Sequence, residues 1–177
     1  MIKIIALLVL FLNISCGLQP VYRTLGSESK SDDYKQELAT IKVEVKQSSI
    51  KRKLLEQQLT NHLEDMLNPD FITADYKYLL TISLQSNQSS SFITSVGTTG
   101  RSKIILTASY QLKQINTNEL IASNSTSAED DTNITDKRFA NYATEQEIER
   151  NLTKIVAANI RNLVINDIFV AKQQVKN

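Results

Sequence analysis

Two long stretches of alternating apolar and polar residues constrain the fold of this chain most strongly. Every second residue is apolar or aromatic from Tyr76 to Leu84, and the same period of two runs from Ile104 to Leu112. Such alternation predicts β-strands with one buried face, because successive side chains of a strand point to opposite sides of the sheet. A shorter stretch, Ile41 to Lys46, alternates in the same way. The chain must therefore fold around a sheet that is apolar on one side.

Two segments with the period of an amphipathic helix can cover that apolar side. The first begins after Ser48-Ser49, which can cap a helix, and runs to about Leu67, where Asn68 and the following proline end it. The second has capping-box spacing from Thr144 to Glu147 and can begin as early as Phe139. Each predicted helix carries one apolar stripe. The stripes are Leu55, Leu59, Leu63, Met66 and Leu67 in the first helix, and Ile148, Leu152, Ile155, Val156, Ile160 and Leu163 in the second.

The segments between the predicted strands are polar. The run from Gln85 to Ser91 breaks the second strand, and residues 86–100 form either a loop or a long hairpin tip that extends both strands. Asn116 to Asn118 is a turn signal, so Glu119 to Thr126 is predicted as a fourth strand that closes a meander. Residues 128–138, AEDDTNITDKR, are then an acidic connection to the last helix.

The order strand, helix, strand, strand, strand, helix predicts an α+β fold. Hairpin-linked strands imply a mainly antiparallel sheet, and two amphipathic helices need a single apolar face to cover. We therefore expect a two-layer sandwich, with a four-stranded, mainly antiparallel sheet and both helices on one face. The 177 residues suffice for one such domain, which we assign to residues 39–177.

The N-terminal residues predict export. Lys3 precedes an unbroken apolar run of nine residues, Ile4 to Leu12. This run matches the apolar region of a signal peptide and is about half the length of a membrane-spanning helix. A buried core segment is the alternative. The single cysteine of the protein, Cys16, follows the small residue Ser15 just after this run, and a small residue at that place favours export.

Residues 13–16 resemble a bacterial lipobox, with Asn13 at the position where leucine is usual. The resemblance implies that residues 1–15 are a signal peptide, that Cys16 is lipidated, and that residues 16–38 form the lipid anchor and a linker. Multiple acyl chains on one cysteine meet the requirement for stable membrane anchoring. An exported protein with a free thiol is the alternative. Gly17, where inner-membrane lipoproteins often carry aspartate, implies the periplasmic face of the outer membrane.

The sequence contains no recognisable catalytic constellation. His62 is the only histidine and lies beside the apolar stripe of the first predicted helix. A single histidine and a single cysteine are too few ligands for a structural zinc site. Gly97 to Gly100 lacks the lysine and the spacing of a phosphate-binding loop. The net charge of +1 argues against a general nucleic-acid binder. We therefore expect no catalytic residues, no metal and no cofactor. An enzyme such as a cell-envelope hydrolase is the least favoured class.

Two segments resemble the LptE family of lipopolysaccharide-assembly lipoproteins. CGLQPVY, residues 16–22, is similar to the mature N-terminus of alphaproteobacterial members, and FANYATEQEIERNLTKIVAANIRNLV, residues 139–164, is similar to their last helix. The resemblance implies a non-enzymatic outer-membrane lipoprotein that plugs the β-barrel LptD and assists delivery of lipopolysaccharide to the outer leaflet. A different lipoprotein binding module, such as an auxiliary subunit of a lipid transporter, is the alternative.

Three groups of residues are candidates for binding. Arg101 and Lys103 flank the start of the third strand, and the LptE resemblance implies that they contact the lipid A phosphates of lipopolysaccharide. Residues 51–53, Lys-Arg-Lys, oppose the helix dipole, so either an anionic partner or simple solvation compensates them. The tip of the hairpin either inserts into the barrel partner or folds back onto its own sheet. Its apolar residues are Phe92, Ile93 and Val96.

Overall fold

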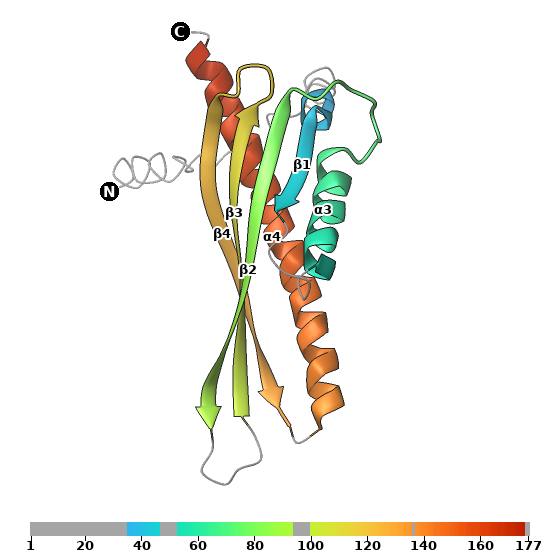
Figure 1. Ribbon diagram of the computed structural model, residues 1–177, viewed down its shortest axis with the longest axis vertical. Coiled ribbons are helices and arrows are strands. Elements are labelled where there is room, and N and C mark those ends of the chain that lie inside the picture. The colour runs from blue at the N-terminus through green and yellow to red at the C-terminus, as the bar shows by residue number, and fades with distance from the viewer. Residues whose placement is uncertain (1–34, 47–52, 94–99, 136, 176–177) are drawn as a thin grey trace, which may run out of the picture. The chain divides into compact units, whose positions relative to one another are not determined.

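The computed structural model describes residues 35–46, 53–93, 100–135 and 137–175 (Figure 1). For residues 90–93 and 174–175 it describes the backbone only. Several predictions from the sequence lie outside these residues. They are the lipidation of Cys16, the linker up to residue 34, the Ser48-Ser49 cap, the charges of Lys51 and Arg52, and the side chains of Phe92, Ile93 and Val96.

The structure confirms the α+β sandwich in its predicted order. After a helical turn at residues 35–39, the elements are β1 (Ile41–Lys46), α3 (Lys53–Leu67), β2 (Tyr78–Ile93), β3 (Gly100–Gln114), β4 (Leu120–Ile134) and α4 (Arg138–Val175). The strands form one sheet in the order β1-β2-β3-β4. Both helices lie on the same side of this sheet (Figure 1).

The strand directions follow from the connections. β2 pairs antiparallel with β3, and β3 pairs antiparallel with β4, as the hairpin turns require. β1 pairs parallel with β2, with Ile41 opposite Tyr78 and Lys46 opposite Ser83. A parallel neighbour needs a crossover connection, and α3 supplies it. The sheet is therefore mixed and mainly antiparallel.

The structure decides one boundary that the sequence left open and corrects another. Of the two alternatives for residues 86–100, the one in which both strands are extended is confirmed, because β2 continues through the polar run Gln85–Ser91 to Ile93, paired with β3. The predicted acidic connection was wrong, because β4 continues past Thr126 to Ile134. Backbone pairing along the β3 ladder holds these residues, so their side chains need no apolar core. α4 begins at Arg138, near the earlier of its two predicted starts.

Polar contacts join the far half of the hairpin to α4. Ser86 Oγ donates to Glu149 Oε1 at 3.0 Å, and Gln88 Nε2 donates to Glu145 Oε1 at 2.8 Å and to Ser102 Oγ at 3.1 Å. The inward face of the sheet thus changes from apolar to hydrogen-bonding beyond Leu84. This explains how the strands extend past the point where their apolar residues end.

The core lies between the sheet and the two helices. The predicted stripes supply most of it, although Ile155 is 49% exposed and Val164 and Ile168 are buried instead. Arg161 of α4 also donates from Nε to the carbonyl of Met66 at 3.1 Å, which satisfies a carbonyl group at the end of α3. The fully buried large side chains include Leu59, Leu63, Leu67, Leu80, Ile82, Leu84, Leu106, Tyr110, Leu112, Leu152, Val156 and Ile160.

One buried hydrogen bond fixes α4 against the middle of the sheet. Tyr110 is 1% exposed, and its hydroxyl donates to Asp167 Oδ2 at 2.5 Å. Asn124 of β4 donates to both groups at 3.3 Å. Burial and the neighbouring carboxylate raise the pKa of Tyr110, so the phenol stays protonated and remains a donor.

A second polar cluster closes the domain where the described chain begins. The Glu37 carboxylate accepts from the Tyr78 hydroxyl at 2.8 Å and pairs with Lys172 Nζ at 3.1 Å and Lys77 Nζ at 3.8 Å. Burial and the bond to Glu37 raise the pKa of Tyr78 to about 12. Burial also raises the pKa of Glu37, but the bonds from Tyr78 and Lys172 outweigh it, and the net pKa lies below the ordinary value. This cluster ties the helical turn, β2 and α4 together.

The turn after α3 holds a phenylalanine in a strained conformation. Phe71 has a φ of 49°, in the left-handed region that costs a bulky residue about 1–2 kcal/mol. The Asn68 side chain braces the turn, because its Oδ1 accepts from the Ile72 amide at 2.8 Å and its Nδ2 donates to the Ile72 carbonyl at 3.0 Å. Phe71 is nonetheless 81% exposed, so packing does not repay the strain.

Replacing Phe71 with Asn should stabilise the fold by about 0.5–1 kcal/mol, because asparagine tolerates the left-handed conformation far better. Urea unfolding measures the change. Phe139→Asn is the matched control, since Phe139 is 84% exposed but lies in α4 with helical geometry. An equal gain in both variants would show that loss of an exposed aromatic, and not strain, is responsible.

Replacing Glu37 with Gln should make the free energy of unfolding less dependent on pH in the acidic range. A lowered folded pKa stabilises the protein above the unfolded pKa, near 4.5, and this stabilisation disappears as the pH falls through the folded value. The free energy of unfolding of the native protein should therefore exceed that of the variant by a constant amount above about pH 5.5, and the difference should shrink below about pH 4.5. Urea titrations from pH 3 to 7 measure it. A difference that does not vary over this range would contradict the assignment.

Candidate interaction surface

The face of the sheet opposite the helices carries a grid of uncharged polar side chains. Thr107 of β3 lies between Gln85 and Ser127, Ser109 lies between Ser83 and Ser125, and Gln111 lies between Thr81 and Ser123. Residues directly opposite each other share a face, so these nine side chains point away from the core. All nine are exposed or half-exposed. The strand alternation of the sequence already implied this polar face, but only the register brings the three strands into rows.

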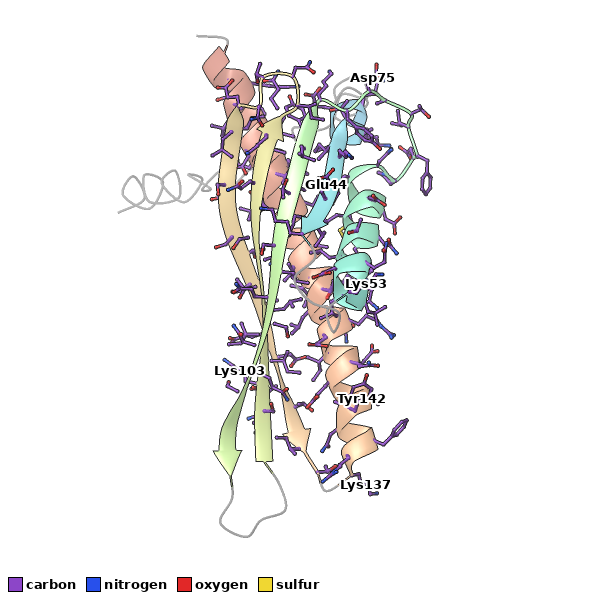
Figure 2. All side chains as sticks on the ribbon, viewed as in Figure 1. Glu44, Lys53, Asp75, Lys103, Lys137 and Tyr142 are labelled. Atoms are coloured by element: carbon purple, nitrogen blue, oxygen red, sulfur yellow. The ribbon has the colours of Figure 1, made fainter. Side chains whose placement is uncertain are left out.

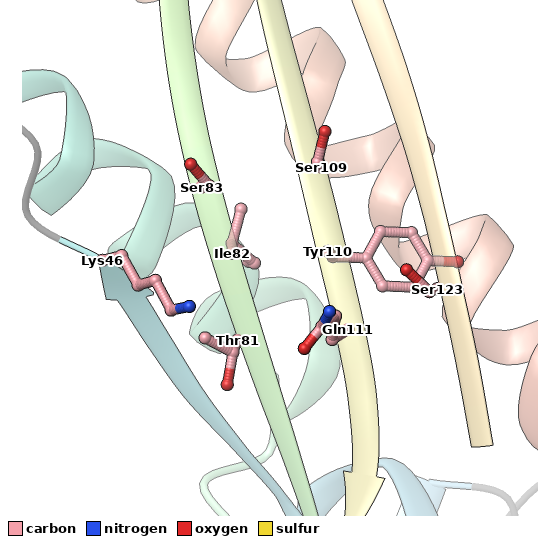
Figure 3. A pocket seen from close by; sticks show the side chains of 8 residues that line it. All are labelled: Lys46, Thr81, Ile82, Ser83, Ser109, Tyr110, Gln111 and Ser123. Atoms are coloured by element: carbon pink, nitrogen blue, oxygen red, sulfur yellow. The ribbon is translucent and has the colours of Figure 1, made fainter. Parts of the chain in front are cut away.

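A shallow hollow lies on this grid. Thr81, Ser83, Ser109, Gln111 and Ser123 line it, together with Lys46 at the end of β1 and parts of Ile82 and Tyr110. Figure 3 shows the Lys46 ammonium directed toward Thr81. Within the described ranges, Lys46 has no carboxylate partner. The hollow offers hydroxyl and amide groups and one cation, and sequence reasoning did not identify it.

The predicted basic pair lies on the same open face, toward the tip of the hairpin. Arg101 Nε is 3.8 Å from Asp131 Oδ2, and Lys103 Nζ is 2.7 Å from Glu129 Oε1. The hydrogen bond to Glu129 is the main reason why the pKa of Lys103 is raised. Figure 2 shows Lys103 on this far part of the sheet. The structure therefore brings Arg101 and Lys103 together on one face, where each is paired with a carboxylate of β4.

The remaining sequence candidates form no further site in the described parts of the chain. His62 is half-buried on α3. Among the residues that the structure describes, no cluster of three or more histidine, cysteine or acidic side chains could hold a metal ion. The helices within the described ranges also include none that is long and apolar enough to cross a membrane.

Comparison with solved structures relates this architecture to bacterial lipoproteins. A protein assigned as a lipoprotein from Caulobacter crescentus superposes with a TM-score of 0.57 at 14% identity, over 80% of this chain and 97% of that one. The minor lipoprotein of Acinetobacter baumannii superposes with a TM-score of 0.51 at 15% identity, over 72% of this chain and 90% of that one. The rare lipoprotein B of Shewanella oneidensis superposes with a TM-score of 0.50 at 11% identity, over 73% of this chain and 97% of that one.

At these identities the likeness establishes the fold alone. The chain has the α+β sandwich found in these lipoprotein structures. No protein-family model matches the sequence, and no curated protein matches it. What the chain binds must therefore be argued from its own surface.

Neutralising the two acids beside the basic pair should strengthen anion binding. In the double variant Glu129→Gln, Asp131→Asn, the partners of Lys103 and Arg101 lose their charge, and the cations become available. We expect the variant to elute from heparin at clearly higher salt than the native protein. The same two substitutions at Glu64 and Asp75, which are exposed elsewhere on the surface, control for net charge. Equal elution of both variants would show that net charge, and not this site, determines retention.

Proposed function

We propose that this protein is a non-enzymatic lipoprotein, anchored through Cys16 on the periplasmic face of the outer membrane, that binds and plugs an LptD-type β-barrel. In this role it assists the insertion of lipopolysaccharide into the outer leaflet. The LptE-like segments at residues 16–22 and 139–164 support the proposal, and so does a fold that occurs in lipoproteins. Neither support identifies a partner by itself.

The observation that carries the proposal is the uncharged polar face of β2, β3 and β4. The interior of a large membrane β-barrel is polar, and in several barrels a folded segment fills it. A plug must exchange hydrogen bonds with water for hydrogen bonds with the barrel wall. Hydroxyl and amide side chains do this at lower cost than charged side chains, because they carry no charge to desolvate. The short serine and threonine side chains also have little rotamer entropy to lose. The rows around Ser109 have this composition.

The basic pair fits lipopolysaccharide at the edge of the same face. Arg101 can bind a phosphate through two parallel hydrogen bonds, and Lys103 adds a point charge. Both ion pairs are at the surface, with Arg101 59% exposed and Glu129 56% exposed. Exposed pairs of this kind are weak, so a phosphate group can displace the carboxylates. We infer that the pairing keeps the cations in place until the ligand arrives.

Substitution of Ser109 with Arg tests the barrel interaction. Ser109 is exposed at the centre of the polar grid, so a long charged side chain should leave the fold intact and obstruct a close-fitting partner. We expect the detergent-solubilised native protein to recover a β-barrel of the LptD type in stoichiometric amount. Ser109→Arg should reduce that recovery at least about tenfold, which corresponds to about 1.4 kcal/mol of binding free energy.

Asn151→Arg is the matched control, because Asn151 is exposed on α4, away from the sheet. It should recover the barrel like the native protein. Equal recovery with Ser109→Arg would contradict docking through the polar face. Recovery of the subunits of a lipid transporter, with no barrel, would instead support the alternative of an auxiliary transporter subunit.

In the same preparation, the double variant Arg101→Ala, Lys103→Ala should lower the amount of bound lipopolysaccharide, and unchanged binding would remove these residues from the site.

A further inference from the structure

We propose that the end of the domain where the described chain begins rests on a phospholipid surface, with Phe71 inserted as an aromatic anchor. This inference rests on the proposed anchoring through Cys16, and it concerns a different part of the molecule from the polar face. It assigns a membrane contact to the folded domain itself.

Large apolar side chains gather at this end without being buried. They come from the turn after α3, the residues before β2 and the turn between β3 and β4. Their exposed fractions are 81% for Phe71, 57% for Tyr76, 52% for Leu120 and 42% for Ile115. The Ile115 amide donates to the Lys77 carbonyl at 2.8 Å, which places Ile115 beside Tyr76. Leu120 pairs with Lys113, two residues before Ile115.

The Phe71 side chain is exposed to solvent and is not packed into the core. Asn68 holds the turn through two side-chain bonds to Ile72, and the Phe71 amide donates to the Asn68 carbonyl at 3.2 Å. The backbone is thus braced at Phe71 in a conformation that other residues adopt more easily, and the side chain is exposed. An aromatic side chain on a braced backbone enters an apolar surface at reduced entropic cost, because the backbone has little freedom left to lose.

The entry point of the chain, taken with the proposed anchor at Cys16, favours lipid as the surface that this end contacts. Lys35 Nζ pairs with Asp70 Oδ2 at 3.0 Å, so the segment that leads from Cys16 joins the domain next to Phe71. Residues 17–34, when fully extended, reach about 60 Å. α4, with 38 residues, is about 57 Å long and separates this end from the far one. Contact by the far end alone would require residues 17–34 to be almost fully extended, so the end beside Phe71 meets the bilayer far more readily.

The charges at this end favour apolar insertion over electrostatic attraction. Lys35 is paired with Asp70, and Lys77 and Lys172 are paired with Glu37. Such an arrangement lacks the unpaired basic cluster that draws a protein to anionic lipids. Aromatic side chains such as Tyr76, by contrast, prefer the boundary between lipid and water. The contact should thus tolerate high salt.

The protein has no tryptophan, so a single substitution creates an unambiguous probe. Phe71→Trp reports on the proposed anchor in the full-length lipidated protein. Phe139→Trp is the matched control, because Phe139 is 84% exposed at the opposite end of the domain. Figure 2 places Asp75 at one end and Lys137 and Tyr142 at the other. Tyr76→Trp provides a second probe at the proposed contact.

The proteins are bound to vesicles of phosphatidylethanolamine and phosphatidylglycerol with and without brominated acyl chains. We expect the emission of Phe71→Trp and of Tyr76→Trp to shift to the blue and to lose at least about half of its intensity to bromine, in both 0.05 M and 0.5 M salt. Phe139→Trp should emit as tryptophan does in water. Water-like emission at positions 71 and 76, in protein that floats with the vesicles, would overturn the proposal. Equal quenching at all three positions would overturn it as well.

Failure of the anchor is distinguishable from failure of the contact. If the native chain does not float with vesicles, or floats equally well as Cys16→Ala, the lipid anchor of the proposed function is wrong. The Phe71→Trp variant is then tethered through an N-terminal histidine tag to nickel-chelating lipid, and its emission is measured again. Quenching there supports the contact independently, and its absence refutes it. A blue shift that requires an added barrel partner, without bromine quenching, would assign Phe71 to a protein interface.

Discussion

Burial of a single face of the sheet beneath α3 and α4 is the constraint on which the rest of the structure depends. The inward residues of β2 and β3 are apolar as far as Leu84 and Ile104, and there the helices supply leucine, isoleucine and valine. Beyond this point the hairpin continues on hydrogen bonds, with Gln88 and Ser86 joined to the glutamates of α4. Apolar burial therefore sets where the helices lie, and polar pairing sets how far the strands extend. The part-buried bond from Tyr110 to Asp167 joins β3 to α4 within the apolar half.

The open face follows from the same constraint. A sheet covered on one side must present polar side chains on the other, but polarity alone does not require that they be uncharged. Here the rows around Ser109 carry hydroxyl and amide groups. Charges lie on both sides of these rows, at Arg101, Lys103, Glu129 and Asp131 toward the tip and at Lys42, Glu44 and Lys46 on β1. A face with this distribution suits a partner that offers hydrogen bonds over a broad area. In the roles proposed for the domain, polar contact lies along the sheet and apolar contact lies at the end beside Phe71.

The outcome for the basic pair illustrates what sequence reasoning reaches. The sequence predicts only that Arg101 and Lys103 flank the start of the third strand, and the structure places both on the open face of β3. The sequence could not reveal that they are neutralised, since the partners lie 26 residues or more away and depend on the register with β4. The acidic residues of β4 were assigned to a connection because runs of polar residues usually mark loops. A ladder of backbone bonds overrides that local preference.

The sequence by itself determined the class of fold, the order of the elements, the buried faces of the first three strands and most of the buried stripe of each helix. These properties depend on hydrophobic periodicity, which is local and is written in every segment. Only the tertiary structure decided the length of the hairpin, the pairing of the charges, the hollow beside Lys46 and the strained presentation of Phe71. These features arise from backbone pairing and side-chain contacts between segments distant in the chain or from the conformation of a braced turn. No periodic pattern in the sequence encodes such contacts.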